Sequence, residues 1–166
     1  MLICLSASAS GTTVQLDAGS EKMMKSPDVA FALQSAQCSQ AGVRLGQLAV
    51  QKATSPGVKA LGQQMIDDHS KAFEKLKLVA ADENLALPES LNAKDQAAYS
   101  KLLTESGDKF DRDYVKAIAN NRKEQIKDCR KEMKKGKDPA IKEFAEGTLA
   151  TLQINSQKIE AIHSGA

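Results

Sequence analysis

The chain has 166 residues, 42% of them hydrophobic, with 23 Lys and Arg against 21 Asp and Glu and a formal net charge of +2. This length and this balance of charge fit one domain with its own core and exclude a disordered chain. The low net charge excludes the strong overall field that marks many nucleic-acid-binding proteins, and a total of two histidines excludes any site built from three of them.

Residues 1–25 differ in composition from the rest of the chain. The segment from Met1 to Leu16 carries no charge, and its apolar start is followed by Ala7-Ser8-Ala9, a small-x-small pattern typical of a signal-peptide cleavage site. We therefore expect residues 1–25 to be a signal remnant or a flexible leader, residues 26–166 to be the folded domain, and the protein to be periplasmic or secreted. No run of about 18 apolar residues predicts a transmembrane segment.

The first half of the domain has the pattern of a helical hairpin. Ser26 and Pro27 form a helix start, and apolar residues at spacings of three, four and seven predict a helix over residues 27–54. Ser55-Pro56-Gly57 breaks that pattern. A second helix is predicted over residues 58–81, and so short a connection makes the two helices antiparallel.

The second half repeats this arrangement after a long connection. Residues 82–106 carry a short helix that Asn92 caps and Gly107 ends. A third long helix is predicted over residues 110–135, and Asp138-Pro139 starts a fourth that runs to the end of the chain. Two hairpins joined by one long crossover predict an all-α fold with ferritin-like four-helix bundle connectivity.

Several short motifs have the order and spacing of a known family. The motifs are Leu45-Gly46-x-Leu48-Ala49, Val58-Lys59-x-x-Gly62-x-x-Met65-x-x-Asp68-His69, Leu87-Pro88, Phe110-Asp111-Arg112-x-Tyr114-Val115 and Leu149-x-Thr151-Leu152. Through them the chain resembles an exported bacterial ferritin-like family catalogued as domain of unknown function 4142, and the resemblance covers residues 30 to 162. It implies a helical bundle and export, and it supplies no activity.

Four polar residues fall at one level of the predicted bundle. Because a helix rises about 1.5 Å per residue, Arg44, His69, Arg122 and Asn155 all lie roughly 20 to 25 Å from one end of a bundle about 40 Å tall. Ferritin-like proteins hold metal ions at this level through inward Glu and His side chains. The resemblance implies metal ligands at several positions of this level, but this chain has only Asp68 and His69 of that kind there.

We therefore predict a mid-bundle polar cluster in place of a metal centre. In this hypothesis Arg44 or Arg122 fills the space of a cation, Asp68 is its counter-ion, and Asn121 or Asn155 completes the hydrogen bonds. The alternative is that both arginines point outwards past the core. No metal and no cofactor are expected.

The cysteines of the domain leave two alternatives open. On the same height scale Cys38 and Cys129 lie close enough for a disulfide that would join the two hairpins. Otherwise both are free buried thiols. A redox sensor built on this pair is a further hypothesis.

Positive charge is concentrated at the end of the third long helix. This basic patch is either a solvated helix end whose cations favour the helix dipole or a surface for an acidic partner. No aromatic residues interleave with it, so nucleic acid is not an expected partner. The patch comprises Lys127, Arg130, Lys131, Lys134, Lys135 and Lys137.

No nucleophile or acid–base pair stands out in the sequence, so an enzyme is not expected and no catalytic residue is assigned. We predict an exported, non-catalytic protein that binds a partner in the bacterial envelope in a stress, maintenance or inhibitor role. The partner is an unidentified protein or an anionic envelope component. The alternative is a ferritin-like metal-binding or redox protein centred on Asp68 and His69.

Overall fold

The computed structural model describes residues 26–165, with side chains as far as residue 162, and within this range it contains five α-helices and no strand. The all-helical fold predicted from the sequence is confirmed. The predicted leader, residues 1–25, lies outside the described residues. The helices are α2 (Pro27–Lys52), α3 (Pro56–Asp82), α4 (Ala93–Leu103), α5 (Gly107–Lys135) and α6 (Pro139–Gly165).

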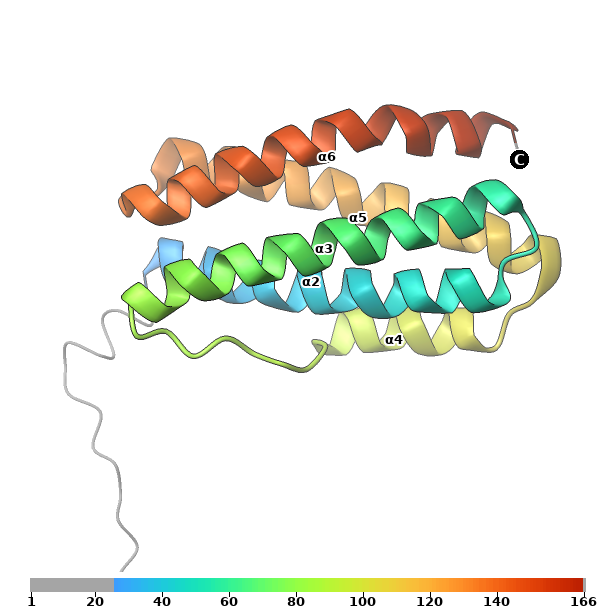
Figure 1. The fold of residues 1–166 in the computed structure, drawn as a ribbon, viewed down its shortest axis with the longest axis horizontal. Coiled ribbons are helices and arrows are strands. Elements are labelled where there is room, and N and C mark those ends of the chain that lie inside the picture. The colour runs from blue at the N-terminus through green and yellow to red at the C-terminus, as the bar shows by residue number, and fades with distance from the viewer. Residues whose placement is uncertain (1–25, 166) are drawn as a thin grey trace, which may run out of the picture.

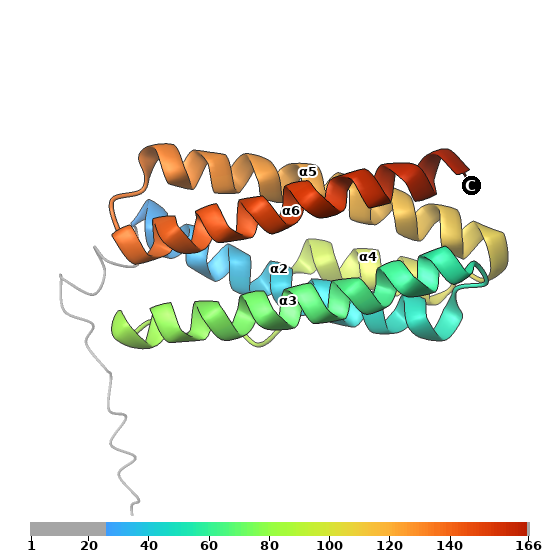
Figure 2. The same ribbon diagram turned by 45° about the horizontal axis from the view of Figure 1, so that its top comes forward.

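The four long helices lie side by side as a bundle of two hairpins (Figure 1). Helices α2 and α3 form the first hairpin, α5 and α6 form the second, and the hairpins meet through α2 with α5 and α3 with α6. Helices α2 and α6 run in one direction, and α3 and α5 run in the other. Figure 2 shows the two hairpins as two layers. The crossover, residues 83–106, carries α4 along α2 and returns the chain to the far end of the bundle.

Proline marks the start of three of the long helices. Pro27, Pro56 and Pro139 stand at the first helical position, where the missing N–H costs no hydrogen bond and the fixed φ suits the helix. The carboxylate of Asp138 accepts the N–H of Ile141 at 2.8 Å and caps α6. The starts of these helices therefore follow from local sequence signals.

The boundary between α4 and α5 differs from the sequence prediction. Asn92 caps α4 as expected, because its Oδ1 accepts the Asp95 N–H at 2.8 Å. Helix α4 ends at Leu103, however, and Gly107 is the first residue of α5 rather than the end of the short helix. Gly107 has a φ of +60°, a conformation that favours glycine. This glycine lets the chain turn directly into α5, so α5 starts three residues before Phe110.

The apolar core is divided into two parts by a buried polar layer. On each long helix one polar residue separates the two parts: Ser39 on α2, His69 on α3, Arg122 on α5 and Asn155 on α6. One part comprises Leu45, Leu48, Ala49, Ala53, Val58, Leu61, Met65, Leu102, Phe110, Tyr114, Val115, Ile118 and Ile159. The other comprises Phe31, Ala32, Ala36, Leu76, Cys129, Ile141, Phe144, Ala145 and Leu152.

A carboxylate from the second hairpin holds the turn of the first. Asp111 on α5, 6% exposed, accepts the N–H of Thr54 at 3.1 Å, the Thr54 hydroxyl at 2.5 Å and the N–H of Ser55 at 2.7 Å. These N–H groups precede α3 and have no partner within the helix. Asp111 therefore provides hydrogen-bond acceptors for the N–H groups at the start of α3, and it links the two hairpins.

A carboxylate from the first hairpin holds the turn of the second in the same way. Asp28 on α2 accepts the N–H groups of Lys137 and Asp138 at 2.6 and 2.8 Å. Burial alone would raise the pKa of Asp28, but these N–H groups lower it to about 2 because they favour the charged form. At each end of the bundle, a carboxylate of one hairpin therefore accepts hydrogen bonds from the turn of the other hairpin.

Glu132 next to this joint makes stability depend on pH. Burial and the neighbouring Asp28 carboxylate raise the pKa of Glu132 to about 7. The folded state therefore holds a proton that the unfolded state releases near pH 4.5, so the unfolding free energy falls as pH rises from about 4.5 to 7. We expect a loss of about 1 to 3 kcal/mol across this window, because a tenfold change in proton affinity corresponds to about 1.4 kcal/mol.

Urea unfolding at pH 5 and pH 8 measures this loss, and Glu132→Gln should remove most of it because a glutamine cannot ionise. Glu89→Gln, at an exposed site of the crossover, is the matched control and should keep the wild-type pH dependence. An unchanged dependence in Glu132→Gln would show that another group is responsible.

Candidate functional site

The two arginines of the predicted mid-bundle cluster have opposite positions. Arg122 on α5 is 4% exposed and belongs to the buried polar layer, whereas Arg44 on α2 is exposed to solvent. Arg44 is therefore not part of the predicted cluster. Of the two arginines, Arg122 is the one whose guanidinium lies inside the bundle.

Asp68 is engaged by Asn155 at this level. The Asn155 amide donates through Nδ2 to Oδ2 of Asp68 at 2.6 Å, and its own Oδ1 accepts from Gln64. Asn155 is 5% exposed. The hydrogen bond joins α3 to α6, so a side chain of the second hairpin supports the carboxylate that the sequence had placed as a counter-ion.

His69 is buried against the backbone of α2. A Cβ added at Gly42 would lie 2.3 Å from the His69 ring, so only glycine leaves room for the imidazole. Burial and the charge of Arg122 together lower the pKa of His69 to about 4, and burial is the larger cause. His69 is therefore neutral at physiological pH and does not act as a pH switch there.

Arg122 has few hydrogen-bond partners among the described residues. Its Nη2 donates to the thioether sulfur of Met65 at 3.2 Å, which is a weak acceptor. Within residues 26–162 it forms no ion pair with a carboxylate. Burial lowers the pKa of Arg122, while the charge of Asp68 opposes that shift. The site thus contains a guanidinium with N–H groups to spare.

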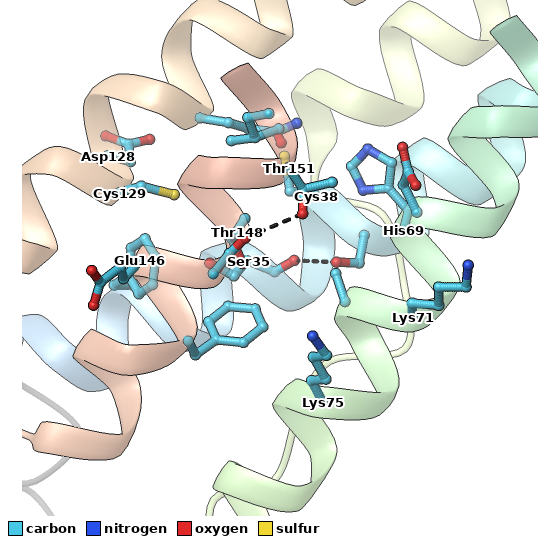
Figure 3. Close-up of a pocket in the computed structure, with 18 of the residues that line it drawn as sticks. Ser35, Cys38, His69, Lys71, Lys75, Asp128, Cys129, Glu146, Thr148 and Thr151 are labelled. Atoms are coloured by element: carbon cyan, nitrogen blue, oxygen red, sulfur yellow. Dashed lines mark hydrogen bonds between the residues drawn. The ribbon is translucent and has the colours of Figure 1, made fainter. Parts of the chain in front are cut away.

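Arg122 and His69 line a cleft of about 920 Å³ to which all four long helices contribute. Its apolar lining includes Phe31 from α2, Val79 from α3, and Phe144 and Leu152 from α6. The rim carries charge: Lys71 and Lys75 project from α3, and Glu146 lies on α6 (Figure 3). Glu143 on α6 also lines the cleft. The cleft therefore combines an apolar wall with a buried cation and a rim of both signs.

Both cysteines of the domain line the same cleft as free thiols (Figure 3). Of the two alternatives for this pair, the structure has the unbridged one. The Cys38 thiol donates to Oδ1 of Asn121 at 3.6 Å, and the same oxygen accepts from Gln125. Asn121 therefore bonds to Cys38 and Gln125 rather than to Asp68. Burial raises the pKa of Cys38 and of Cys129 to about 12. Such thiols are weak nucleophiles near neutral pH.

The basic patch lies on the surface, separate from the cleft. All six residues are exposed, on the last turns of α5 and the residue after Gly136: Lys127, Arg130, Lys131, Lys134, Lys135 and Lys137.

The described residues of the cleft offer polar and apolar contacts to a ligand. Within residues 26–162 no group of three or more His, Cys, Asp or Glu side chains is arranged to hold a metal ion. No helix of the described part is long and apolar enough to cross a membrane. The cleft offers a cation, hydrogen-bonding groups and apolar surface instead.

Sequence reasoning missed most of the residues that line the cleft. On α3 the missed residues Lys71, Ala72, Lys75 and Val79 continue from Asp68 at spacings of three and four, which places them on one helix face. That spacing was a usable signal. It could not show that α6 stands away from this face, because the separation depends on how the two hairpins pack.

The fold and the site define an all-α helical bundle with an open cleft between two hairpins. The chain belongs to the family described as domain of unknown function (DUF4142), which it matches over residues 13–162. No curated protein matches the chain in sequence.

Three solved structures have a similar fold. A DUF305 fragment from Deinococcus radiodurans is 10% identical, with a TM-score of 0.75 over 84% of this chain and 97% of its own. A putative secreted DUF305 protein from Streptomyces coelicolor is 12% identical, with a TM-score of 0.69 over 82% and 89%. CopM in its Cu(II)-bound form is 14% identical, with a TM-score of 0.70 over 83% and 96%. At these identities the likeness shows the fold alone.

Proposed function

We propose that this protein is an exported, non-catalytic helical bundle that binds a partner of the bacterial envelope in the cleft between its two hairpins. The observation that carries the proposal is the cleft itself. Its volume of about 920 Å³ lies within the range of ligand sites. Its chemistry favours binding over catalysis, because His69 is neutral and buried and the two thiols have raised pKa values.

Export is supported by two separate features. Residues 1–25 have the composition of a signal remnant or leader. The similar structure from Streptomyces coelicolor is described as a putative secreted protein. A ferritin-like relationship is supported by the directions of the four long helices and by the long crossover between the hairpins.

The buried cation of the cleft favours an anionic envelope component as the partner. Arg122 is the charged residue of the buried polar layer, whereas the exposed rim carries both signs, with Lys71 and Lys75 on α3 and Glu143 and Glu146 on α6. The exposed basic patch at the end of α5 adds a second surface that would attract an acidic molecule. An acidic protein partner is therefore the competing occupant.

Site-specific photo-crosslinking tests the proposal in the cells that produce the protein. A photoreactive residue replaces Thr151, an exposed residue of α6 that lines the cleft. The control position is Ile154, on the same helix and 68% exposed but outside the cleft lining. We expect an adduct at position 151 and none at 154. An adduct at both positions or at neither would contradict binding in the cleft.

A second candidate function is metal binding or redox chemistry centred on Asp68 and His69. It is favoured by the similar structures of CopM, which are described as Cu(II)-bound and Cu(I)-bound forms, and by the neutral state of His69. The positive charge of Arg122 and the engagement of Asp68 by Asn155 oppose it. Elemental analysis of protein made without chelator separates the two: near-stoichiometric metal that is lost in His69→Ala would favour this candidate.

A further inference from the structure

We propose that the cleft binds a single-chain anionic amphiphile, such as a fatty acid, whose small oxyanion head pairs with Arg122 and whose hydrocarbon chain lies on the apolar wall. This inference rests on the proposed function and names the chemical class of its partner. No residue of the basic patch takes part in it.

The buried state of Arg122 points to a missing anion. A guanidinium has five N–H donors, and among the described residues this one has a single acceptor, the Met65 sulfur. Its nitrogens are not among the fully buried atoms that lack a partner, so the remaining N–H groups are accessible from the cleft that Arg122 lines. A carboxylate or phosphate matches the fork of a guanidinium with two parallel hydrogen bonds. An oxyanion of a ligand in the cleft would supply the acceptors that the described residues do not give to Arg122.

The nearest acidic residue does not fill this role. Asp68 is close enough for its charge to raise the pKa of Arg122, yet the two make no ion pair in the described structure. Its Oδ2 accepts from Asn155 at 2.6 Å. Asp68 therefore helps to keep Arg122 charged, while the guanidinium itself remains open to the cleft that it lines.

The apolar wall extends away from Arg122 along the bundle. Phe31 and Phe144 stand edge to face with their ring centroids 6.4 Å apart, and Leu152 and Val79 line the same cleft. From Asp68 to Val79 the cleft follows α3 for eleven residues, which is about 16 Å of helix. Leu78, at the open side, is 72% exposed. This geometry suits an elongated apolar chain with its polar head at mid-bundle.

The rim has little net preference for sign, so selectivity for an anion must come from Arg122. The rim carries Lys71 and Lys75 on α3 and Glu143 and Glu146 on α6, and all four are exposed. Asp128, a further acidic residue of the lining beside Asp68, accepts from Gln34 at 2.9 Å. Exposed charges are screened by solvent and salt, whereas the largely buried guanidinium is screened much less.

Calorimetric titration of the purified full-length chain tests the inference with matched probes. Dodecanoate, below its micellar concentration, is compared with methyl dodecanoate and with dodecyltrimethylammonium, which keep the chain but remove or reverse the charge. We expect saturable binding of one dodecanoate per chain and binding at least about 10-fold weaker for the other two, the loss that one charge-assisted hydrogen bond gives. Equal binding of all three would overturn the inference.

The variant Arg122→Met tests whether the anionic head group pairs with this residue. Arg44→Met, at an exposed position, is the matched control. We expect Arg122→Met to weaken dodecanoate about 10- to 100-fold and to leave methyl dodecanoate unchanged, while Arg44→Met changes neither. Replacing a buried charge by an apolar side chain of similar size often leaves folding intact, and thermal unfolding checks this. If Arg122→Met does not fold, the comparison of the three probes on the wild-type chain still tests whether the cleft prefers an anionic head group.

The two proposals can fail separately. Dodecyl phosphate binding as tightly as dodecanoate would support pairing with Arg122 and widen the head group to phosphate. A protein adduct at position 151 without dodecanoate binding would overturn this inference and leave the proposed function standing. Dodecanoate binding that depends on Arg122, without any adduct at position 151, would support the inference and contradict the proposed function in the cell.

Discussion

Replacing Asp111 with alanine is expected to lower the free energy of unfolding by about 2 to 3 kcal/mol, because it removes the acceptor of a buried hydrogen-bond network. The carboxylate accepts two N–H groups and a hydroxyl from Thr54 and Ser55 in the turn between α2 and α3. An alanine leaves these groups without a partner at the start of α3. Urea unfolding followed by circular dichroism measures the loss.

Asp108→Ala is the matched control for this prediction. Asp108 has the same charge and stands in the first turn of the same helix, but it is exposed. Its loss should cost only the interaction with the helix dipole, about 0.3 to 1 kcal/mol. Asp111→Asn keeps one acceptor oxygen and should fall between the two. If Asp111→Ala costs no more than Asp108→Ala, solvent replaces the carboxylate and the joint contributes little.

The helices could be predicted because their signals are local. Pro27 and Pro139 mark helix starts, Gly136 follows the end of α5, and apolar spacing defines the buried faces. The one clear difference, the start of α5 at Gly107, arises because a glycine can either end a helix or turn the chain into the next one. Sequence alone does not distinguish these two uses.

The positions of the two arginines could have been decided by periodicity. Gln47 and Gln51 lie three and seven residues after Arg44 and are exposed, so they share a polar face with it. Ile118 and Cys129 lie four residues before and seven after Arg122, and both are buried. The prediction used only the height of each arginine along the bundle, which is the same for both. Whether an arginine enters the core depends on the face of its helix on which it lies.

The joints and the cleft could not be predicted from local sequence. Asp28 and Asp111 contact turns that lie 109 and 56 residues away in the sequence, so their partners are set by the packing of one hairpin on the other. The same packing opens the cleft between α3 and α6. Sequence patterns give the face of each helix, and they do not give the distance between helices of different hairpins.

The structure explains two glycines of the family motifs by the close approach of α2 and α3. A Cβ added at Gly46 would lie 2.6 Å from the carbonyl oxygen of Gly62, and a Cβ at Gly62 would lie 2.8 Å from the Cβ of Ala49. Both distances are shorter than van der Waals contact. The glycines therefore set how closely the first hairpin packs, and through it the position of His69 against α2.

Gly46→Ala is accordingly expected to destabilise the fold, although alanine is the better helix former. The clash involves a backbone oxygen that cannot rotate away, and overpacking of this kind costs about 1 to 3 kcal/mol. Gly147→Ala is the matched control, since a Cβ at Gly147 in α6 meets nothing within 4 Å and should stabilise by up to about 1 kcal/mol. Thermal and urea unfolding of both variants should give shifts of opposite sign. A stabilising shift in Gly46→Ala would mean that α2 and α3 can separate at little cost, and that the contact between Gly42 and His69 does not fix the hairpin.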